Sequence, residues 1–455
     1  MAAQREYDIV LLGATGYTGK LTAEYITTSL PTNIRWAVAG RNQSKLQSLV
    51  NELKSLNSTR DVPDIITIGG LNTSELSDLV KKTKVLLNTV GPYYLYSTPV
   101  VEACAQLGTH YVDVSGETPW VREIIVKYEE TAKKSGAILI PETGVESAPS
   151  DIVAYVATRL VRKVWDCGVM DVVASVHELK SSGPSGGTLA SGLGLFEHYP
   201  LSEVKKCSDP FVLSPSKLHP YTKETIYPPN PVPNTYSRTA LQKLTGVWSY
   251  PRLGTLTTSL ASTANAAIVH RSAGLTPYFY GFNFTYEEYM AVSSPVVGFF
   301  IHIAISLLAI LLAFPPTRAI LKLFAAYKPG SGPAKESTKN DALELRAIAT
   351  AEQLAKTPRK ALATFRFEGG LYHLTAVLLA EAGFILATKE EEIKKAHGVG
   401  FLTPSCLGDD YVERLQKANV KINVQQIGDV GSKYGGIELS HGYENLMADT
   451  SRQPL

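Results

Sequence analysis

The chain has 455 residues, of which 44% are hydrophobic and 19% are charged, and its formal net charge is +2. This length predicts two or three domains, and a net charge so near zero gives no electrostatic reason to expect nucleic acid as a partner. The four cysteines, at positions 104, 167, 207 and 406, lie far apart, so we expect no metal site and a reducing compartment. The N-terminal residues show no secretory signal, which predicts a cytosolic first domain.

A short apolar run at 9–12 predicts a buried strand. Three glycines in the spacing GxxGxxG follow it, and a helical pattern comes next, which is the order that a dinucleotide-binding loop requires. Glycines here permit the tight turn, the approach of the backbone to the pyrophosphate and close packing of helix on strand. The alternative is a tight turn without a ligand. The predicted cofactor contacts are Gly13, Thr15, Gly16, Tyr17, Thr18 and Gly19.

The second predicted strand, 34–39, is followed by Gly40, Arg41 and Asn42. NAD-specific sites place an acidic residue at the end of this strand, where it accepts a hydrogen bond from the ribose 2′-hydroxyl. Arg41 offers instead a guanidinium that can bind a 2′-phosphate through two charge-assisted hydrogen bonds. We therefore predict NADP(H) as the cofactor, with contacts from Arg41 and Asn42. The alternative for Arg41 is an ordinary surface arginine.

Further strands are predicted at 84–90, 109–117 and 137–144, and helical patterns alternate with them. This alternation predicts an α/β fold with a doubly wound parallel sheet of the Rossmann type over residues 1–150. Ligands of such sheets bind at the carboxyl ends of the strands. The residues expected around the nicotinamide half of the cofactor are Asn88, Thr89, Val90, Gly91, Pro92, Ser115, Gly116 and Glu117.

The candidate catalytic residues are Tyr93 and Tyr94, which directly follow one of these strand ends. A tyrosine at this place could protonate a carbon or an alkoxide after a hydride arrives. The competing interpretation is aromatic packing over the cofactor. His177 and His270 fall in segments that resemble strands, where they are expected to be core histidines.

Several motifs together resemble a known family: GATGYTGKL, AGRNQSKL, LLNTVGPY, YVDVSGE and SGPSGGTLASGL. The chain resembles the saccharopine dehydrogenase-like oxidoreductases, which include the mycobacterial trans-acting enoyl reductases. The resemblance implies an NADP-type nicotinamide fold with an inserted second domain, and a C-terminal part that packs back on the first domain. It also implies reduction of double bonds in lipid-like chains, if the chain follows the enoyl reductases of this group.

The second domain is predicted at 151–365 as an inserted α+β domain, and 366–455 is expected to return to the first domain. Within the second domain, the glycine–serine loop is expected to present backbone N–H groups to an anionic or carbonyl group of the substrate, or to part of the cofactor. The alternative is a flexible connector. A strand-like pattern follows at 255–272. The predicted substrate-loop residues are Ser185, Gly186, Gly187 and Thr188.

An apolar stretch at 293–314 is long enough to cross a bilayer, because residues 295–314 contain no charged side chain. Three interpretations compete: a membrane span, a buried core helix, and an interfacial or re-entrant helix. The flanking charges oppose a span, since the basic residues follow the stretch and an acidic pair precedes it. We favour an interfacial or re-entrant helix, followed by a basic amphipathic helix at 317–328 along the headgroups. His302 and Ser306 are one turn apart and are expected to pair.

Together these features predict an NADPH-dependent reductase of an apolar, lipid- or polyketide-like enoyl or carbonyl substrate, free or bound to a carrier. The expected location is the cytosolic face of a membrane, either the endoplasmic reticulum or a lipid droplet. One alternative is a saccharopine-type dehydrogenase of amino-acid metabolism, which would need basic residues for its dicarboxylic substrate. Another is a lipid-surface protein that keeps the cofactor fold without turnover. The oligomeric state stays open, with a homodimer as one arrangement.

Overall fold

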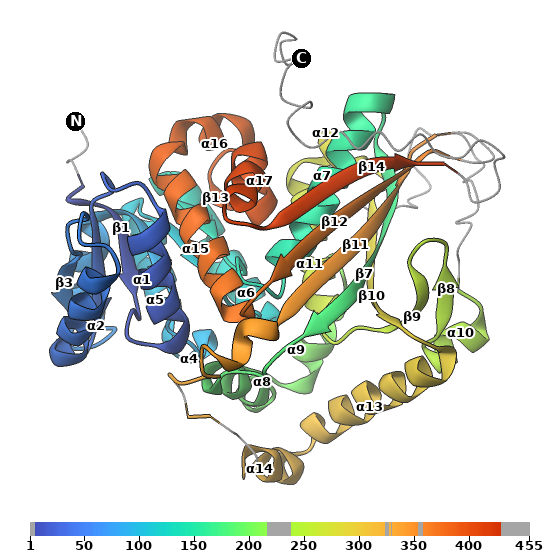
Figure 1. The fold of residues 1–455 in the computed structure, drawn as a ribbon, viewed down its shortest axis with the longest axis horizontal. Coiled ribbons are helices and arrows are strands. Elements are labelled where there is room, and N and C mark those ends of the chain that lie inside the picture. The colour runs from blue at the N-terminus through green and yellow to red at the C-terminus, as the bar shows by residue number, and fades with distance from the viewer. Residues whose placement is uncertain (1–4, 216–237, 324–326, 329, 354–357, 429–455) are drawn as a thin grey trace.

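Two seven-stranded sheets organise the protein (Figure 1). The structure, a computed structural model, describes residues 5–215, 238–323, 327–328, 330–353 and 358–428. The first sheet has the order β13-β6-β5-β4-β1-β2-β3, and all its neighbours pair in parallel. Its strands are β1 (Tyr7–Leu12), β2 (Trp36–Gly40), β3 (Asp64–Thr67), β4 (Thr83–Asn88), β5 (His110–Asp113), β6 (Ile138–Ile140) and β13 (Gly400–Phe401).

Helices cover both faces of the first sheet, which confirms the predicted doubly wound parallel sheet. Alternate side chains of β1 enter two separate cores: Ile9 and Leu11 face one, Val10 and Leu12 the other. Burial on both faces of the sheet explains why the strand is apolar over its last four residues. The order of the strands reverses between β1 and β4, where open α/β sheets bind ligands. The helices are α1 (Tyr17–Ser29), α2 (Gln43–Leu56), α3 (Thr73–Lys81), α4 (Tyr93–Tyr96), α5 (Thr98–Leu107) and α6 (Thr118–Ser135).

The second sheet is mixed and has the order β14-β12-β11-β7-β10-β9-β8. Only β7 and β10 pair in parallel among its described neighbours. Helix α7 (Ala148–Trp165) packs on β11 and β12 and joins the two sheets into one core. The strands are β7 (Val169–Lys180), β8 (Trp248–Tyr250), β9 (Gly254–Thr258), β10 (Thr285–Val292), β11 (Ala342–Ala351), β12 (Lys360–Glu368) and β14 (Lys421–Ile427).

The segment predicted as a strand at 255–272 is mostly helical. Strand β9 ends at Thr258, and α11 (Ser262–Leu275) follows and packs on β10. The helix is buried on nearly all sides, so its small residues show no apolar periodicity that would distinguish it from a strand. His270 lies on this helix rather than in a strand, and its Nε2 atom accepts a hydrogen bond from the Tyr286 backbone N–H at 3.2 Å.

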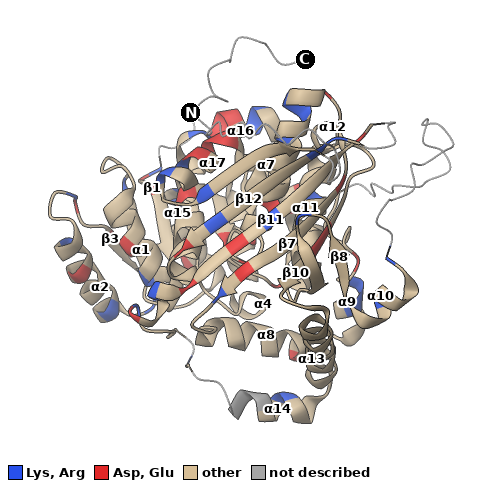
Figure 2. Cartoon of the chain, turned by 45° about the vertical axis from the view of Figure 1, so that its right-hand side comes forward, with Lys and Arg blue, Asp and Glu red and all other residues tan. Residues whose placement is uncertain are grey.

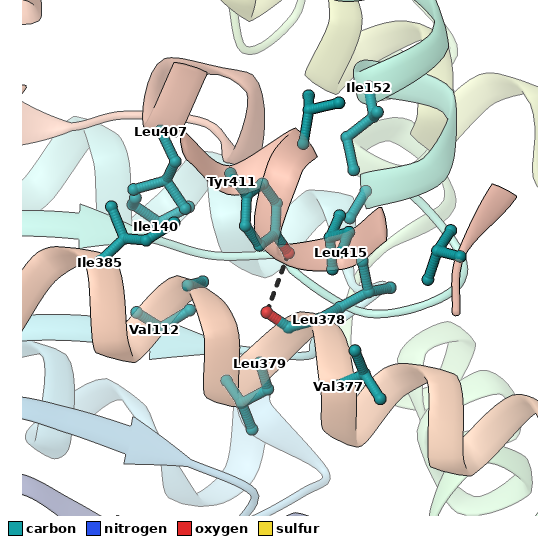
Figure 3. Packing of buried hydrophobic residues seen from close by; sticks show 14 of the residues in the cluster. Val112, Ile140, Ile152, Val377, Leu378, Leu379, Ile385, Leu407, Tyr411 and Leu415 are labelled. Atoms are coloured by element: carbon teal, nitrogen blue, oxygen red, sulfur yellow. Dashed lines mark hydrogen bonds between the residues drawn. The ribbon is translucent and has the colours of Figure 1, made fainter. Parts of the chain in front are cut away.

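The C-terminal part of the chain contributes to both sheets. Helix α15 (Leu371–Thr388) packs against α1, β4 and β5 of the first sheet. Figure 3 shows its side chains meeting those of β5, β6 and α17, with the Tyr411 hydroxyl donating to the Leu378 carbonyl at 2.9 Å. Gly383 allows this approach, because a Cβ there would lie 2.6 Å from Leu87. The remaining elements are η1 (Ser337–Asn340), α16 (Glu390–His397), η2 (Pro404–Leu407) and α17 (Gly408–Lys417).

Helix α13 (Pro295–Ala313) lies on the outside of the molecule and carries no charged side chain (Figures 1 and 2). Gly298 alone is buried among its residues, so the interpretation as a buried core helix is wrong. The helix packs against β9, β10 and α8. The smaller helices of this half are α8 (Gly186–His198), α9 (Leu201–Lys206), α10 (Ala240–Thr245), α12 (Pro277–Tyr280) and α14 (Pro315–Leu323).

Two details near α13 differ from the sequence expectation. His302 does not pair with Ser306, because its Nδ1 atom lies 2.8 Å from the Thr258 hydroxyl of β9. The predicted basic helix at 317–328 begins earlier, at Pro315, and residues 324–326 lie outside the described part. Arg318 of this helix is only 7% exposed, since its guanidinium donates to the carbonyls of Phe196 and Leu312. Its charge therefore does not lie on an outer basic face.

Candidate active site

The glycine loop after β1 has the geometry of a phosphate-binding turn. Gly13 adopts φ +84°, a conformation that side chains disfavour, and its N–H donates to the Ala39 carbonyl of β2 at 3.0 Å. A Cβ at Gly19 would collide with the Gly13 carbonyl and with Ala14. The loop therefore brings the start of α1 directly onto the end of β1.

The N-terminus of α1 is open to an anion. Gly16 occupies the N-cap, no side chain caps the helix, and the first turn contains no acidic residue. Unpaired N–H groups and the positive end of the helix dipole favour a phosphate at such a place. Thr15, Tyr17 and Thr18 are all partly exposed around this terminus. The residues present thus fit the pyrophosphate of a dinucleotide.

The end of β2 presents Arg41 to solvent. Arg41 is exposed and makes no hydrogen bond or ion pair with any residue that the structure describes. Asn42 has a structural task, because its Oδ1 atom caps α2 by accepting from the Lys45 N–H at 3.0 Å and the Ser44 hydroxyl at 2.8 Å. The free guanidinium fits a ribose phosphate, whereas the Asn42 side chain is already engaged.

At the end of β4, the side-chain amide of Asn88 holds the turn that follows. The Asn88 side chain is buried, donates to the Ser97 and Tyr111 hydroxyls and accepts from the Val90 N–H. It therefore organises the turn from inside rather than facing a ligand. The Thr89 hydroxyl donates to the Leu12 carbonyl of β1 at 2.9 Å, which joins the two strand ends at the crevice. The Gly91–Pro92 peptide bond that follows is cis.

The two candidate tyrosines have different environments. Tyr93 is buried against Trp120, and its hydroxyl donates to the Asn88 carbonyl at 3.3 Å. Burial raises the pKa of Tyr93 well above its usual value, and this position favours the packing alternative for its ring. Tyr94 is half-buried, its ring lies tilted against that of His198 of α8 at 4.8 Å, and it contacts Gly194 of the same helix. Of the two tyrosines, Tyr94 is the more accessible to a ligand.

The loop after β5 is held by a buried carboxylate. Asp113 accepts hydrogen bonds from the Ser115 N–H and hydroxyl, from the Glu142 N–H and from the Tyr111 hydroxyl. The Ser115 side chain is therefore engaged within the protein, and Gly116 is the position where the loop can approach a ligand. A Cβ at Gly116 would collide with the carboxylate of Glu146.

Acidic side chains surround this loop. Glu117 is buried, and its two oxygens accept from the Tyr93 and Tyr94 backbone N–H groups at 3.0 and 2.8 Å. Burial raises its pKa, although a hydrogen bond from Ser191 of α8 opposes the shift. Glu142 is fully buried with φ +56°, and Glu146 is exposed. In the described part of the chain, no cluster of His, Cys, Asp and Glu has the arrangement of a metal site.

The predicted substrate loop is tied down rather than open. The Ser185 N–H donates to the Tyr372 hydroxyl at 2.6 Å, the Gly186 N–H to the Ser331 carbonyl at 3.0 Å, and the Thr188 N–H to the Ser185 hydroxyl at 3.2 Å. Three N–H groups of the predicted loop are therefore already paired within the protein. Gly187 is the remaining predicted position.

Tyr372 connects this loop to the glycine loop. Its ring meets that of Tyr17 edge to face at 5.1 Å, and its hydroxyl lies 2.7 Å from that of Thr188. Tyr17 in turn donates to the Pro333 carbonyl at 2.7 Å. The contact between Tyr17 and Tyr372 joins residues more than 350 positions apart, and no local sequence pattern predicts it. Glu142 and Glu146 were also missed, because the predicted strand 137–144 included the first part of the polar turn PETGVES, which follows the end of β6 at Ile140.

Helix α8 forms one wall beside the cofactor residues. It packs against α4 on one side and against α13 and α14 on the other. A Cβ at Gly91 would lie 3.8 Å from the Ser191 hydroxyl, so α8 approaches the turn that follows β4. The same helix thus contacts both the predicted nicotinamide region and the exposed apolar helix.

Comparisons with known proteins agree with this geometry. Residues 9–140 match the family described as "Saccharopine dehydrogenase NADP binding domain". The chain is 30% identical to trans-acting enoyl reductases of Mycobacterium tuberculosis and Mycobacterium leprae, over 93% of this chain and 99% of each relative. The apo saccharopine dehydrogenase (L-Glu forming) of Saccharomyces cerevisiae shares the fold, with a TM-score of 0.52 at 12% identity, over 93% of this chain and 100% of that one.

The identity extends over nearly the whole of both chains, and the glycine loop, the arginine after β2 and the parallel sheet are all present. The chain therefore belongs to the saccharopine dehydrogenase-like oxidoreductases, a family of NADP-dependent enzymes that includes the trans-acting enoyl reductases.

Proposed function

We propose that the protein is an NADPH-dependent reductase of an apolar enoyl substrate, with a carbonyl group as the alternative acceptor. The observation that carries this proposal is the position of α8, which packs on both α4 at the nicotinamide region and the exposed apolar helix α13. An apolar chain held along α13 and α8 would end beside the residues that bind the cofactor. The name shared by the mycobacterial relatives supports the enoyl group as the reacting one.

The protein's contribution is to bind and orient. The α1 N-terminus and Arg41 would hold the phosphates, and Gly91 and Gly116 allow the backbone to approach the nicotinamide. NADPH supplies a hydride when bound. The Tyr94 ring beside His198 and the wall of α8 would exclude water on this side, which would limit competing reactions of the substrate.

A saccharopine-type substrate is the second candidate, and the charges at the site oppose it. Glu117, Glu142 and Glu146 lie at the strand ends, where an amino-dicarboxylic substrate would need arginine or lysine. Acidic side chains give such a substrate no cation to bind, and the Glu117 carboxylate, which accepts two backbone N–H groups, would repel it at close range. An uncharged acyl chain meets no such penalty. A lipid-surface protein without turnover is the third candidate, and only an activity assay separates it from the first.

The decisive experiment follows NADPH absorbance in the presence of long-chain 2-enoyl thioesters, with short-chain thioesters and with glutamate plus a semialdehyde as comparisons. Consumption of NADPH with long-chain thioesters supports the enoyl proposal. Stimulation by glutamate and the semialdehyde alone would favour the amino-acid alternative. Binding of NADPH without any turnover would favour the non-catalytic protein.

Cofactor preference is tested with Arg41→Ala. Loss of a charge-assisted contact to the 2′-phosphate should raise the Kd for NADPH by at least about tenfold and leave that for NADH unchanged. Arg359→Ala, an exposed arginine beside β12, is the matched control and should change neither constant. An unchanged ratio of the two constants in Arg41→Ala would refute the role of Arg41.

We further propose that α13 lies on a lipid surface, either the cytosolic side of the endoplasmic reticulum or a lipid droplet. Apart from α13 and α15, no helix in the described ranges is long and apolar enough to cross a membrane. An uncharged, outward-facing helix of 19 residues favours the interface, because its contacts with β9 and β10 hold it against the rest of the protein. Flotation with phosphatidylcholine vesicles tests this. Protein that stays in the lipid-free fraction would overturn it, and a homodimer that covers α13 would then be the next arrangement to measure.

A further inference from the structure

Four buried carboxyl groups and one exposed one lie near one another, after β5, after β6 and on β10. They belong to Asp113 and Glu117 after β5, Glu142 and Glu146 after β6, and Glu288 on β10. Mutual repulsion couples Glu146 to Glu117 and Glu288, and Glu142 to Glu146 and Asp113. A group of acids alone indicates no function, so the hydrogen bonds of each carboxylate decide what the group can do.

Three of the five carboxylates are fully engaged. Asp113 receives four hydrogen bonds, and Glu117 receives the two backbone N–H groups described above. Glu288 accepts from the Asn265 amide, from the Ser150 hydroxyl at 2.6 Å and from the Tyr286 hydroxyl at 2.9 Å. Such saturation stabilises a buried charge, and these three groups therefore serve the architecture.

Glu142 and Glu146 differ from the others. Glu142 is fully buried, its Oε1 atom has no hydrogen-bond partner among the described residues, and its Oε2 atom has only the Ser147 hydroxyl at 3.4 Å. A buried carboxyl oxygen without a donor is costly unless it carries a proton or meets a ligand. Burial, followed by repulsion from Glu146, raises the pKa of Glu142 well above its usual value.

Glu146 combines an exposed side chain with an interior position. Its carboxylate makes no hydrogen bond with any residue that the structure describes, yet it lies directly over Gly116 of the nicotinamide loop. Desolvation by the surrounding protein, followed by repulsion from Glu288 and Glu117, raises the pKa of Glu146 to about 7. The carboxylate is therefore open to solvent and lies against the backbone of the loop after β5.

We propose that Glu146 is the acid that delivers the proton to the substrate, with buried Glu142 as the group that shares and replaces that proton. The proposal stands on the unpartnered carboxylate over Gly116, on the orphaned Glu142 oxygen beside it, and on the cofactor site described above. It rests on the proposed reductase function and names a residue for the half of the reaction that the cofactor does not perform.

The chemistry balances without any further reagent. NADPH provides the hydride for the β-carbon of the enoyl group, and the O–H bond of the Glu146 carboxyl breaks as a C–H bond forms at the α-carbon. The Glu146 carboxylate that remains takes a proton from the Glu142 carboxyl, and solvent, to which Glu146 is exposed, returns a proton to the pair. A general acid is most effective when its pKa lies near the working pH, a condition that Glu146 meets and Tyr93 does not.

The experiment compares Glu146→Gln, Glu146→Asp and the wild type, with Glu130→Gln on the exposed side of α6 as the control. The first measurement is proton uptake on NADPH binding near pH 7, by calorimetry in buffers of different ionisation enthalpy. Bound NADPH should cover the half-protonated Glu146 carboxyl, so the wild type should take up protons on binding. Binding of NADP+ should cause less proton uptake, because its positive ring favours the charged carboxylate. Glu146→Gln should lose this uptake, and Glu146→Asp and Glu130→Gln should retain it.

The second measurement is the pH profile of kcat with an enoyl thioester. The wild type should lose rate as the pH rises through about 7, because the acid loses its proton. Glu146→Gln should lower kcat by about 100-fold or more, with a flat profile and little change in KM, while Glu146→Asp keeps part of the rate. Retained proton uptake and an unchanged profile in Glu146→Gln would overturn the proposal. If proton uptake depends on Glu146 but no enoyl thioester is reduced, the proposed reductase function is wrong, whereas the coupling of Glu146 to cofactor binding stands.

Discussion

The helices α13 and α15 have almost the same length and both are apolar enough to cross a bilayer, yet they lie in opposite environments. In its most apolar stretch, 78% of α15 is buried, against 6% of α13. Helix α15 fills the space between α1, α17 and the first sheet, whereas the main contacts of α13 within the described chain are with β9, β10, α8 and α14. Composition alone does not separate a core helix from an exposed one, because the elements that pack around a helix determine whether it is buried.

The largest expected difference between the two helices is in stability. Leu378→Ala should lower the free energy of unfolding by about 2–5 kcal/mol, because the side chain is fully buried in the core of Figure 3. Leu307→Ala on α13 is the matched substitution and should change it by less than about 0.5 kcal/mol, since Leu307 is 52% exposed. Urea unfolding of both variants in the absence of lipid measures the contrast, and equal losses would mean that α13 is covered in solution.

The pH should act on the protein body around α15 and not on α13. Asp151 of α7 accepts from the Ser272 hydroxyl and the Ser405 N–H, and burial raises its pKa to about 6. The folded state therefore holds this proton at a pH where the unfolded chain has lost it, so its contribution to stability falls as the pH rises from about 4 to 6.

Removing this carboxyl should remove that part of the pH dependence. The difference in unfolding free energy between Asp151→Asn and the wild type should shift by about 1–3 kcal/mol in favour of the variant as the pH rises from 4 to 7. This shift is expected whatever the difference is at pH 4. Urea titrations at several pH values provide the measurement. A difference that stays constant across this range would show that Asp151 is ionised throughout.

Lipid binding, in contrast to stability, should depend on α13 and not on α15. Changing Phe300, Leu307 and Ile310 together to serine removes exposed apolar area and should weaken vesicle binding by at least about tenfold with little loss of stability. The control replaces Val126, an apolar side chain of α6 that is 74% exposed, with serine and should bind vesicles as the wild type does. Equal binding of all three proteins would contradict the lipid proposal.

The smallest expected effect concerns the attachment of α13 to the second sheet. Thr258→Val removes the hydroxyl that pairs with His302 and should lower the free energy of local unfolding of α13 by about 1 kcal/mol. Because α13 forms few other contacts, the loss should appear as faster hydrogen exchange in α13, with exchange in α15 unchanged. Faster exchange in both helices would mean that they unfold as one unit.

Local patterns were enough to predict five strands of the first sheet and its glycine loop, but not the two edge strands β3 and β13. Strand, glycine turn and helix lie next to one another in the sequence, and Gly13, Gly19 and Arg41 have roles that adjacent residues define. Helix α11 was mistaken for a strand because burial on all sides removes the apolar periodicity that reveals a helix.

The remaining parts of the site depend on contacts between distant segments. The Tyr372–Ser185 and Tyr17–Pro333 hydrogen bonds close the substrate loop, and neither partner carries a local signal for the other. Asn88 and Tyr93 were expected to face a ligand because they follow a strand end. Their side chains turn inward instead, since the turn between β4 and α5 needs its own hydrogen bonds.

The edge strand β13 has a consequence for how the protein is made. Gly400 and Phe401 pair with β6, and α15 covers one face of the same sheet. A ribosome that has produced only the first 150 residues has therefore released neither the seventh strand nor the covering helix. Because chains begin to fold as they emerge, the nucleotide-binding half must wait in an incomplete form, with apolar surface exposed, until residues near 400 leave the tunnel.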